Sequence, residues 1–363
     1  MKAVAITAEK KLEVKEISEP TQKSGSVLVD VKRAGICGSD IHYWEMGEPK
    51  GLVMGHEFSG VVTNPGSRKD LKVGDRVTAL PISPCNKCEA CLTGNPQYCR
   101  ETWNKAVGLS LTNPGAYAPK LSVRPDMVIK LPNKVSDEEG AMVEPAAVGL
   151  HAVHLAKVKV GSKVLVVGGG IIGLMSAMFS KLQGASLVAV SETNAARGKN
   201  AVKQQVADVF LDAKSNKFIE LTNTISEGGF DVVIDCSGNS VAVNSALMAV
   251  KPGGIVVLAG VSMLPISFAS VVAVMSELTV QGAIGYTKEE FETCVKLMET
   301  KQISVKKFVS KTVALEEVQD AFLELTNGKT NSIKILIDPN KVYTPPKTIA
   351  KKSTKQTKKP SSK

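Results

Sequence analysis

The sequence predicts an α/β protein with two domains, of which the first is β-rich and the second is built on a doubly wound parallel sheet. The 363 residues are enough for about two domains, and 43% hydrophobic with 22% charged residues is ordinary for a soluble globular chain. Short strands with charged, Gly, Pro or Ser separators dominate the first part. From Lys163 onward, continuous apolar runs typical of buried parallel strands alternate with helical stretches.

The β-rich domain is expected over residues 1–150. Ser136, followed by three acidic residues, is typical of a capped helix start. Pro145 and Gly149 predict that the helical stretch to His151 is broken into two pieces. The expected strands of this domain cover residues 3–6, 12–15, 26–31, 73–80, 115–118 and 127–132.

The parallel-sheet domain is expected over residues 151–285. Residues 286–340 carry two amphipathic helical stretches and a strand at 333–337, and we expect them to return and complete the first domain. The expected strands of the parallel sheet cover residues 164–167, 186–190, 231–235, 255–259 and 278–281.

The net charge of +10 is concentrated at the C-terminus. Residues 341–363 hold eight lysines and no acid, which leaves a charge of only +2 on the rest of the chain. A nearly neutral body argues against an enzyme that acts on nucleic acid. We expect the tail to be disordered and solvated, with a weak contact to RNA or an anionic membrane as the less favoured alternative.

The cysteine count and the N-terminus predict a cytoplasmic protein. Seven cysteines occur in a chain without a secretory signal at its start, which indicates a reducing compartment. No apolar run approaches the ~20 residues that span a bilayer, so no membrane partner is expected.

Four of the seven cysteines fall in one short segment with the spacing C-x2-C-x2-C-x7-C. A loop with this spacing can place four thiolates around one zinc ion. Two disulfides are the alternative, which the absence of a secretory signal disfavours. We therefore predict a structural zinc, which does no chemistry itself, held by Cys85, Cys88, Cys91 and Cys99.

A glycine-rich turn follows the first parallel strand. Gly168, Gly170 and Gly173 fit the dinucleotide fingerprint G-x-G-x-x-G, with Ile171 and Ile172 opening the helix whose N-terminus faces the phosphates. Nineteen residues after Gly173, Glu192 ends the next strand. A carboxylate there accepts a hydrogen bond from the ribose 2′-hydroxyl and repels a 2′-phosphate, which favours NAD over NADP. Arg197, five residues on, is expected to soften this preference, to stack near the adenine or to be a solvated surface residue.

A second candidate metal set is scattered along the first domain. It comprises Cys37, His56, Glu57 and Glu144. Each alone is weak, because a lone Cys is most often a small core residue and Glu144 could simply bound a helix before Pro145. Glycine-rich turns around Cys37 and the His56-Glu57 pair favour a site.

These motifs together resemble the zinc-containing medium-chain dehydrogenase/reductase family over residues 1 to about 340. The resemblance is carried by residues 35–42 and 55–60, the cysteine segment, the glycine fingerprint and residues 143–152. Within the family, residues 41–45 are similar to sorbitol dehydrogenases. Residues 144–151 and the short Cys37–His56 gap are similar to galactitol-phosphate dehydrogenases, and residues 285–286 with 289–291 to 2,3-butanediol dehydrogenases.

The resemblance implies a GroES-like catalytic domain, a Rossmann domain and a substrate cleft between them. It implies that Cys37 and His56 bind a catalytic zinc, and it leaves the third ligand open between Glu57 and Glu144. Asp40 is expected to support a ligand histidine. Ser39 is expected to take the proton of a zinc-bound alcohol and His42 to pass it to solvent, while His151 and His154 are expected to be packed or surface residues.

The expected activity is hydride transfer between NAD and a polyol, a polyol phosphate or another secondary alcohol, with two zinc ions per chain. L-Threonine 3-dehydrogenase is an alternative within the same frame. A dinucleotide-binding protein tethered to nucleic acid by the lysine tail is the alternative outside enzymes. The resemblance also implies a homodimer or homotetramer.

Overall fold

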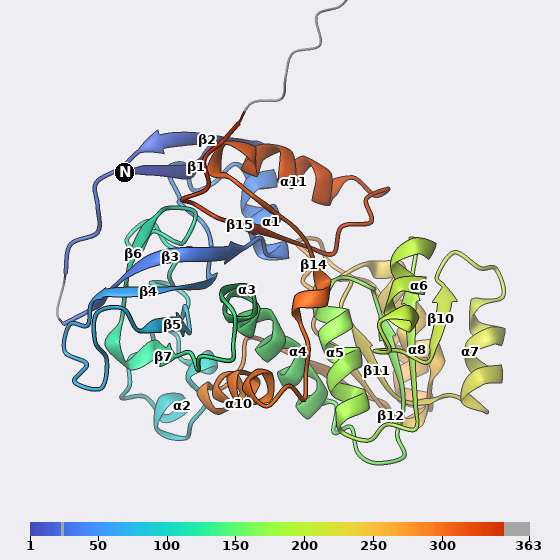
Figure 1. Cartoon of the computed structure of the whole chain (residues 1–363). Helices are drawn as coiled ribbons and strands as arrows, with labels where there is room; N and C mark the ends of the chain where they lie inside the picture. The colour runs from blue at the N-terminus through green and yellow to red at the C-terminus, as the bar shows by residue number, and fades with distance from the viewer. Residues whose placement is uncertain (23–24, 345–363) are drawn as a thin grey trace, which may run out of the picture.

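Two large sheets organise the chain, one in each half of the molecule (Figure 1). The structure is a computed structural model that describes residues 1–22 and 25–344. Most of the predicted tail, residues 345–363, lies outside the described residues. Among the helices that the structure describes, none is both long and apolar enough to cross a lipid bilayer.

The N-terminal half is β-rich, as predicted. Its main sheet has seven strands on the path β14-β15-β3-β4-β5-β7, with β6 paired to β3. A separate hairpin is formed by β1 and β2. These strands are β1 (Lys2–Ala8), β2 (Lys11–Glu16), β3 (Val27–Gly35), β4 (Glu57–Asn64), β5 (Arg76–Ala79), β6 (Lys120–Val123), β7 (Val128–Lys130), β14 (Val309–Val313) and β15 (Lys334–Ile337).

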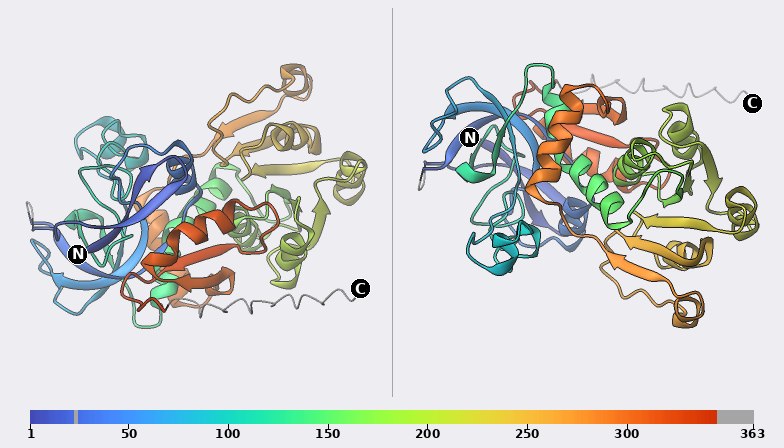
Figure 2. Two further views of the ribbon diagram at one scale, coloured as in Figure 1. Left: turned by 90° about the horizontal axis from the view of Figure 1, so that it is seen from above. Right: turned by 90° about the horizontal axis from the view of Figure 1, so that it is seen from below.

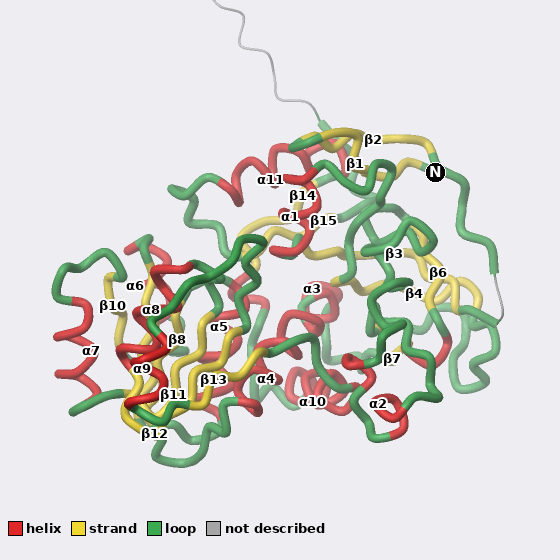
Figure 3. The backbone as a smooth tube through the Cα atoms, turned by 180° about the vertical axis from the view of Figure 1, so that it is seen from behind, coloured by secondary structure: helices red, strands yellow, loops and turns green. Residues whose placement is uncertain are grey.

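The second sheet has six parallel strands in the order β10-β9-β8-β11-β12-β13. The strand order reverses between β8 and β11, which is where ligands bind in open α/β sheets. Figure 3 shows these strands as one twisted layer with helices around it. The strands are β8 (Lys163–Val167), β9 (Leu187–Glu192), β10 (Val209–Asp212), β11 (Phe230–Asp235), β12 (Val250–Leu258) and β13 (Thr279–Gly282). The predicted fold class is confirmed.

The helices connect and cover the two sheets. In the parallel half, α5 packs on α4 and α7 packs on α8, and α10 lies alongside α4 in the centre of the molecule (Figure 2). The helices are α1 (Gly38–Met46), α2 (Glu89–Leu92), α3 (Asp137–Ala141), α4 (Val143–Leu155), α5 (Ile171–Leu182), α6 (Ala195–Lys203), α7 (Phe218–Ser226), α8 (Ser240–Ala249), α9 (Ser270–Met275), α10 (Lys288–Glu299) and α11 (Val318–Thr326).

The helix pair α3–α4 differs in one respect from the prediction. Ser136 caps α3 as expected, since its hydroxyl accepts the N–H of Glu139 at 3.2 Å. The break falls at Met142, however, and Pro145 and Gly149 both lie inside α4. Pro145 occupies the first turn, where its missing N–H has no partner to lose. Gly149 allows α5 to approach, because a Cβ there would lie 2.5 Å from the Cβ of Met175.

The strand expected at residues 115–118 is wrong. Ala116, Tyr117 and Ala118 are all fully buried, without the alternation of a half-exposed strand. Their segment instead bonds residues 53–55 through its backbone, and the strand β6 forms just after it against β3. Strands β10 and β14 were not predicted, because both are short and mix polar with apolar residues.

The last strand returns to the first half of the chain. Leu336 of β15 pairs with Gly35 of β3, so residues from both ends of the sequence share one sheet. This pairing supports the predicted domain limits of 1–150 with 286–340 and of 151–285, which we keep as a proposal.

Candidate active site

The four-cysteine segment forms a compact lobe around α2. The sulfur atoms of Cys88 and Cys91 lie 3.5 Å apart and those of Cys85 and Cys91 3.9 Å, and no cysteine of the chain is in a disulfide. The N–H of Cys85 points at the sulfur of Cys99 at 3.4 Å. This contact lowers the pKa of Cys99 to about 6. Four convergent sulfurs fit a tetrahedral zinc ion.

A second group of potential ligands lies between β3 and α4. One sulfur, nitrogen or oxygen atom from each of Cys37, His56 and Glu57 lies within 4.8 Å of the other two. Cys37 precedes the first residue of α1, and His56 and Glu57 stand at the start of β4. His56 and Glu57 are buried. The structure therefore brings Cys37 together with the adjacent pair His56 and Glu57, which are three of the four predicted residues.

Asp40 bonds the backbone at the N-terminus of α1 and faces His56. One carboxylate oxygen of Asp40 accepts the N–H of Cys37 at 3.0 Å and the hydroxyl of Tyr117 at 2.7 Å, while the other lies 3.5 Å from Nδ1 of His56. This places Nδ1 of His56 toward Asp40 and leaves Nε2 for a ligand. Burial lowers the pKa of His56, but Asp40 and Cys37 together raise it well above its usual value.

Glu144 lies in the first turn of α4, beside the metal group and outside its three-residue core. Its Oε1 accepts a hydrogen bond from the hydroxyl of the fully buried Tyr286 at 2.9 Å. Burial raises the pKa of Glu144 to about 7, with His56 opposing the rise and Glu57 adding to it.

Glu57 forms an ion pair with Lys334 of β15, and both side chains are fully buried. The carboxylate oxygen Oε1 of Glu57 has no hydrogen-bond partner and no contact with solvent. Such an orphaned acceptor beside a thiol and an imidazole is suited to a cation. The donor set of sulfur, nitrogen and oxygen therefore fits zinc with room for a further ligand.

The other predicted polar residues lie at the rim or elsewhere. Ser39 and His42 are both half-buried on α1, one turn apart, and Nδ1 of His42 lies 4.0 Å from Glu45. His151 and His154 lie outside the metal group, as predicted. Their Nδ1 atoms contact the carboxylate of Glu290 on α10 at 2.9 and 2.7 Å.

The glycine turn has the geometry that a dinucleotide needs. Gly168 has a φ of +102°, and a Cβ at Gly173 would overlap the carbonyl oxygen of Gly168. Gly170 directly precedes α5, whose first turn, from Ile171 and Ile172 on, receives no side-chain cap. Its N–H groups are therefore available to phosphate oxygens. A cavity of about 550 Å³ opens here, lined by residues that include Gly168, Gly170, Glu192, Arg197 and Lys214.

Glu192 is fixed at the carboxyl end of β9. Its carboxylate accepts N–H groups of Gly169 at 2.9 Å and Thr193 at 2.7 Å, and it lies 3.4 Å from Arg197. Burial raises the pKa of Glu192. Arg197 and these hydrogen bonds lower it by a larger amount, so the pKa lies below its usual value. The cavity therefore has a fixed negative charge beside the glycine turn.

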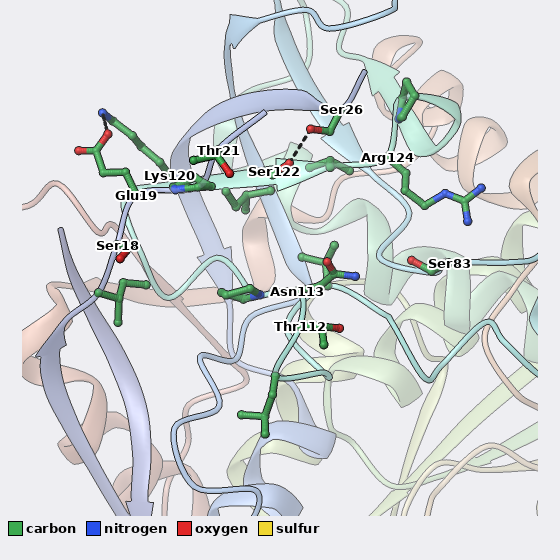
Figure 4. A pocket seen from close by; sticks show the side chains of 18 of the residues that line it. Ser18, Glu19, Thr21, Ser26, Ser83, Thr112, Asn113, Lys120, Ser122 and Arg124 are labelled. Carbon is green, nitrogen blue, oxygen red and sulfur yellow. Dashed lines mark hydrogen bonds and ion pairs between the residues drawn. The ribbon is translucent and has the colours of Figure 1, made fainter. Parts of the chain in front are cut away.

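A larger cavity of about 680 Å³ lies on the outer side of the β-rich half (Figure 4). Two pairs of its polar residues bond each other: Lys120 pairs with Glu19 at 2.7 Å, and Ser122 donates to Ser26 at 2.8 Å. None of the predicted site residues lines it.

Family comparisons agree with this arrangement. Residues 23–133 match the alcohol dehydrogenase GroES-like domain, and residues 172–300 match the zinc-binding dehydrogenase domain. The D-xylulose reductase A of Aspergillus oryzae is 33% identical over 324 residues, which cover 86% of this chain and 88% of that protein. The chain belongs to the zinc-containing medium-chain dehydrogenase/reductase family.

Solved structures of dehydrogenases share the whole fold. The 2R,3R-butanediol dehydrogenase of Bacillus subtilis is 30% identical with a TM-score of 0.82, covering 93% of this chain and 99% of that one. The galactitol-1-phosphate dehydrogenase of Escherichia coli is 26% identical with a TM-score of 0.83, covering 93% and 100%. The expected GroES-like and Rossmann parts are confirmed.

The sequence did not identify three residues that bond to the buried acids of the site. Tyr117, Tyr286 and Lys334 each contact one buried acid of the site across a long stretch of sequence. Only Lys334 leaves a local signal, because it is a lysine inside the apolar run of residues 333–337.

Substitution of Gly173 by Ala is expected to weaken nucleotide binding. The added methyl group would push α5 away from the turn, so we expect the dissociation constant for NADH to rise at least about tenfold, a cost of about 1.4 kcal/mol. NADH fluorescence titration measures this. Gly328→Ala is the control, because a Cβ there meets no atom within 4 Å; equal affinities of the two variants would contradict the expectation.

The pH dependence of stability is expected to reflect Glu144. A carboxyl group whose pKa rises from 4.5 to about 7 on folding binds its proton more tightly in the folded state, so stability falls as pH rises across that interval. Glu144→Gln avoids this loss. After metal removal, the variant should have a higher melting temperature than the unchanged protein at pH 8 and the same melting temperature near pH 5. The expected difference in the free energy of unfolding at pH 8 is on the order of 1–3 kcal/mol. The exposed change Glu292→Gln should show no such pH dependence, and a pH-independent effect of Glu144→Gln would contradict the assignment.

Proposed function

We propose that this chain is a zinc-dependent dehydrogenase that transfers hydride between NAD and a secondary alcohol of a polyol or polyol phosphate. The convergence of Cys37, His56 and Glu57, with an orphaned carboxylate oxygen, carries the proposal. The neighbouring glycine turn and Glu192 supply the nucleotide site. The family to which the chain belongs supports the same pairing of metal and nucleotide chemistry.

Zinc would be held by Cys37, His56 and Glu57. Glu144 would keep its hydrogen bond from Tyr286 and would not be a ligand. We prefer Glu57 as the third ligand because its oxygen lies with the other two donors, whereas Glu144 is not part of that group. When bound, zinc lowers the pKa of an alcohol and so makes it a better hydride donor.

The chain's own residues orient the reactants and move the proton. Asp40 holds His56 with Nδ1 away from the metal position. Ser39 and His42, one turn apart at the rim on α1, would take the hydroxyl proton to solvent. The carbinol C–H leaves as hydride to the nicotinamide, so one alcohol and NAD⁺ give one ketone, NADH and a proton.

NAD is the proposed nucleotide because Glu192 places a buried carboxylate at the ribose end of the cavity. A 2′-phosphate would meet this charge at close range. Arg197 already pairs with Glu192 and so is only partly available to a phosphate.

The names of the relatives support a polyol-like substrate. They act, by name, on xylulose, butanediol and galactitol 1-phosphate. L-Threonine, the second candidate, shares the secondary alcohol beside a polar neighbour. A nucleic-acid tether without catalysis would need the lysine tail, of which residues 345–363 lie outside the described part, and gives no reason for the donor set around Cys37.

A substrate panel tests the proposal. We expect NADH formation with a polyol, a polyol phosphate or 2,3-butanediol, and little with L-threonine or with NADP in place of NAD. Initial rates at 340 nm measure this for each alcohol. No turnover on any alcohol, with two zinc ions bound per chain, would contradict the proposal; turnover on L-threonine alone would favour the second candidate.

Cys37→Ala is expected to remove the catalytic zinc and leave the lobe intact. Metal analysis should fall from two zinc ions per chain to one. The rate should fall at least about a thousandfold, because bound metal supplies several kcal/mol of transition-state stabilisation. Cys294→Ala, a change at a thiol outside the site, should keep both ions and the rate. Activity in Cys37→Ala would refute the ligand assignment.

We further propose that two copies pair along the edge strand β13. All four residues of β13 are exposed, and α9 beside it exposes Val271, Val274 and Met275. An open sheet edge beside exposed apolar side chains favours association. Sedimentation analysis should show a dimer or tetramer that Val274→Asp dissociates, whereas Val160→Asp, at an equally exposed position outside this patch, should not. A monomeric unchanged protein would contradict it.

A further inference from the structure

Lys334 is a buried lysine whose ammonium group has two partners. It forms the ion pair with Glu57 and donates to the carbonyl oxygen of Ile36 at 2.8 Å. Lys334 is 1% exposed and Glu57 is 0% exposed, so the pair is shielded from water. Ile36 directly precedes Cys37. Lys334 therefore contacts the backbone next to one proposed ligand, Cys37, and the side chain of another, Glu57.

The backbone beside the Lys334–Glu57 pair has no room for a side chain at Gly35. A Cβ at Gly35 would overlap Oε2 of Glu57 and would lie 2.9 Å from Cε of Lys334. Gly35 pairs with Leu336 across β3 and β15, so the strand pairing sets the position of the ammonium group. Buried ion pairs rarely add stability, and removing one partner alone is strongly destabilising. A role for this pair beyond stability is therefore worth testing.

The carboxylate of Glu57 is shared between two neighbours. Its Oε2 is paired with Lys334, and one of its oxygens also lies within 4.8 Å of a donor atom from each of Cys37 and His56. A carboxylate that is drawn to an ammonium group on one side donates less electron density to a cation on the other side. Lys334 thus attracts the carboxylate of Glu57 away from the metal position.

We propose that Lys334 is a positioning residue that competes with the metal for Glu57 and so weakens the third ligand. This inference rests on the metal site of the proposed function. A weakly held carboxylate would make the bound metal more accessible to substrate and water. Without Lys334, Glu57 has the metal as its only cationic partner and binds it more tightly.

The test compares metal retention in Lys334→Met with that in the unchanged protein. Both are loaded with zinc and challenged with a chelator, and the release of each ion is followed separately. The cysteine lobe serves as an internal reference in the same molecule. Lys311→Met, which removes a lysine from an exposed ion pair with Glu324, is the matched control.

We expect Lys334→Met to release the catalytic zinc about tenfold more slowly, at the lower end of the range for groups that support metal ligands. Release from the lobe should not change. Lys334→Arg, which keeps the charge, should behave like the unchanged protein. In Lys334→Met/Glu57→Gln the gain should disappear, because there is no carboxylate left to bind the metal.

Faster or unchanged release from Lys334→Met would overturn the inference, since a purely structural role predicts a looser site. If that variant does not fold, Lys334→Gln, which can still donate to Ile36, makes the same comparison. The absorption spectrum of the cobalt-substituted variants reports whether the ligand set around the metal has changed. Failure of the proposed function is recognised separately, because the unchanged protein would then bind only one zinc ion per chain.

Discussion

The burial of several ionisable side chains at one place is the constraint on which the active half of the molecule depends. Asp40, His56, Glu57 and Glu144 are almost inaccessible to water. Each of the three acids is compensated by a group from another part of the chain: Asp40 by Tyr117, Glu144 by Tyr286 and Glu57 by Lys334. The strands and helices that carry these partners must be in place before the acids can be buried.

This constraint explains why the C-terminal segment belongs to the first half of the chain. Strand β15 reaches β3 with Lys334 already at its start, and α10 follows Tyr286 directly. Lys334 of β15 and Glu57 of β4 lie in the same sheet, whereas α4 contacts both β4 and α5 and so connects the two halves of the molecule. Disruption of β15 would leave Glu57 without its cation.

Features that depend on short stretches of sequence could be predicted. The cysteine lobe and the glycine turn are each defined within fifteen residues or fewer, and both have the expected geometry. The choice between Glu57 and Glu144 could not be made, because their partners Lys334 and Tyr286 are distant in sequence. The helix break at Met142 was misplaced because Pro145 was treated as a breaker when it stands in a first turn.

The cysteine lobe also touches the wall of the site, although it takes no part in the chemistry. Gly285, which precedes Tyr286, packs so closely on Trp103 and Gln97 that a Cβ there would lie 3.1 Å from the indole ring. Gln97 lies between Cys91 and Cys99, inside the loop that the lobe's metal closes. A displacement of this loop would therefore be transmitted through Gly285 to Tyr286, which donates a hydrogen bond to Glu144.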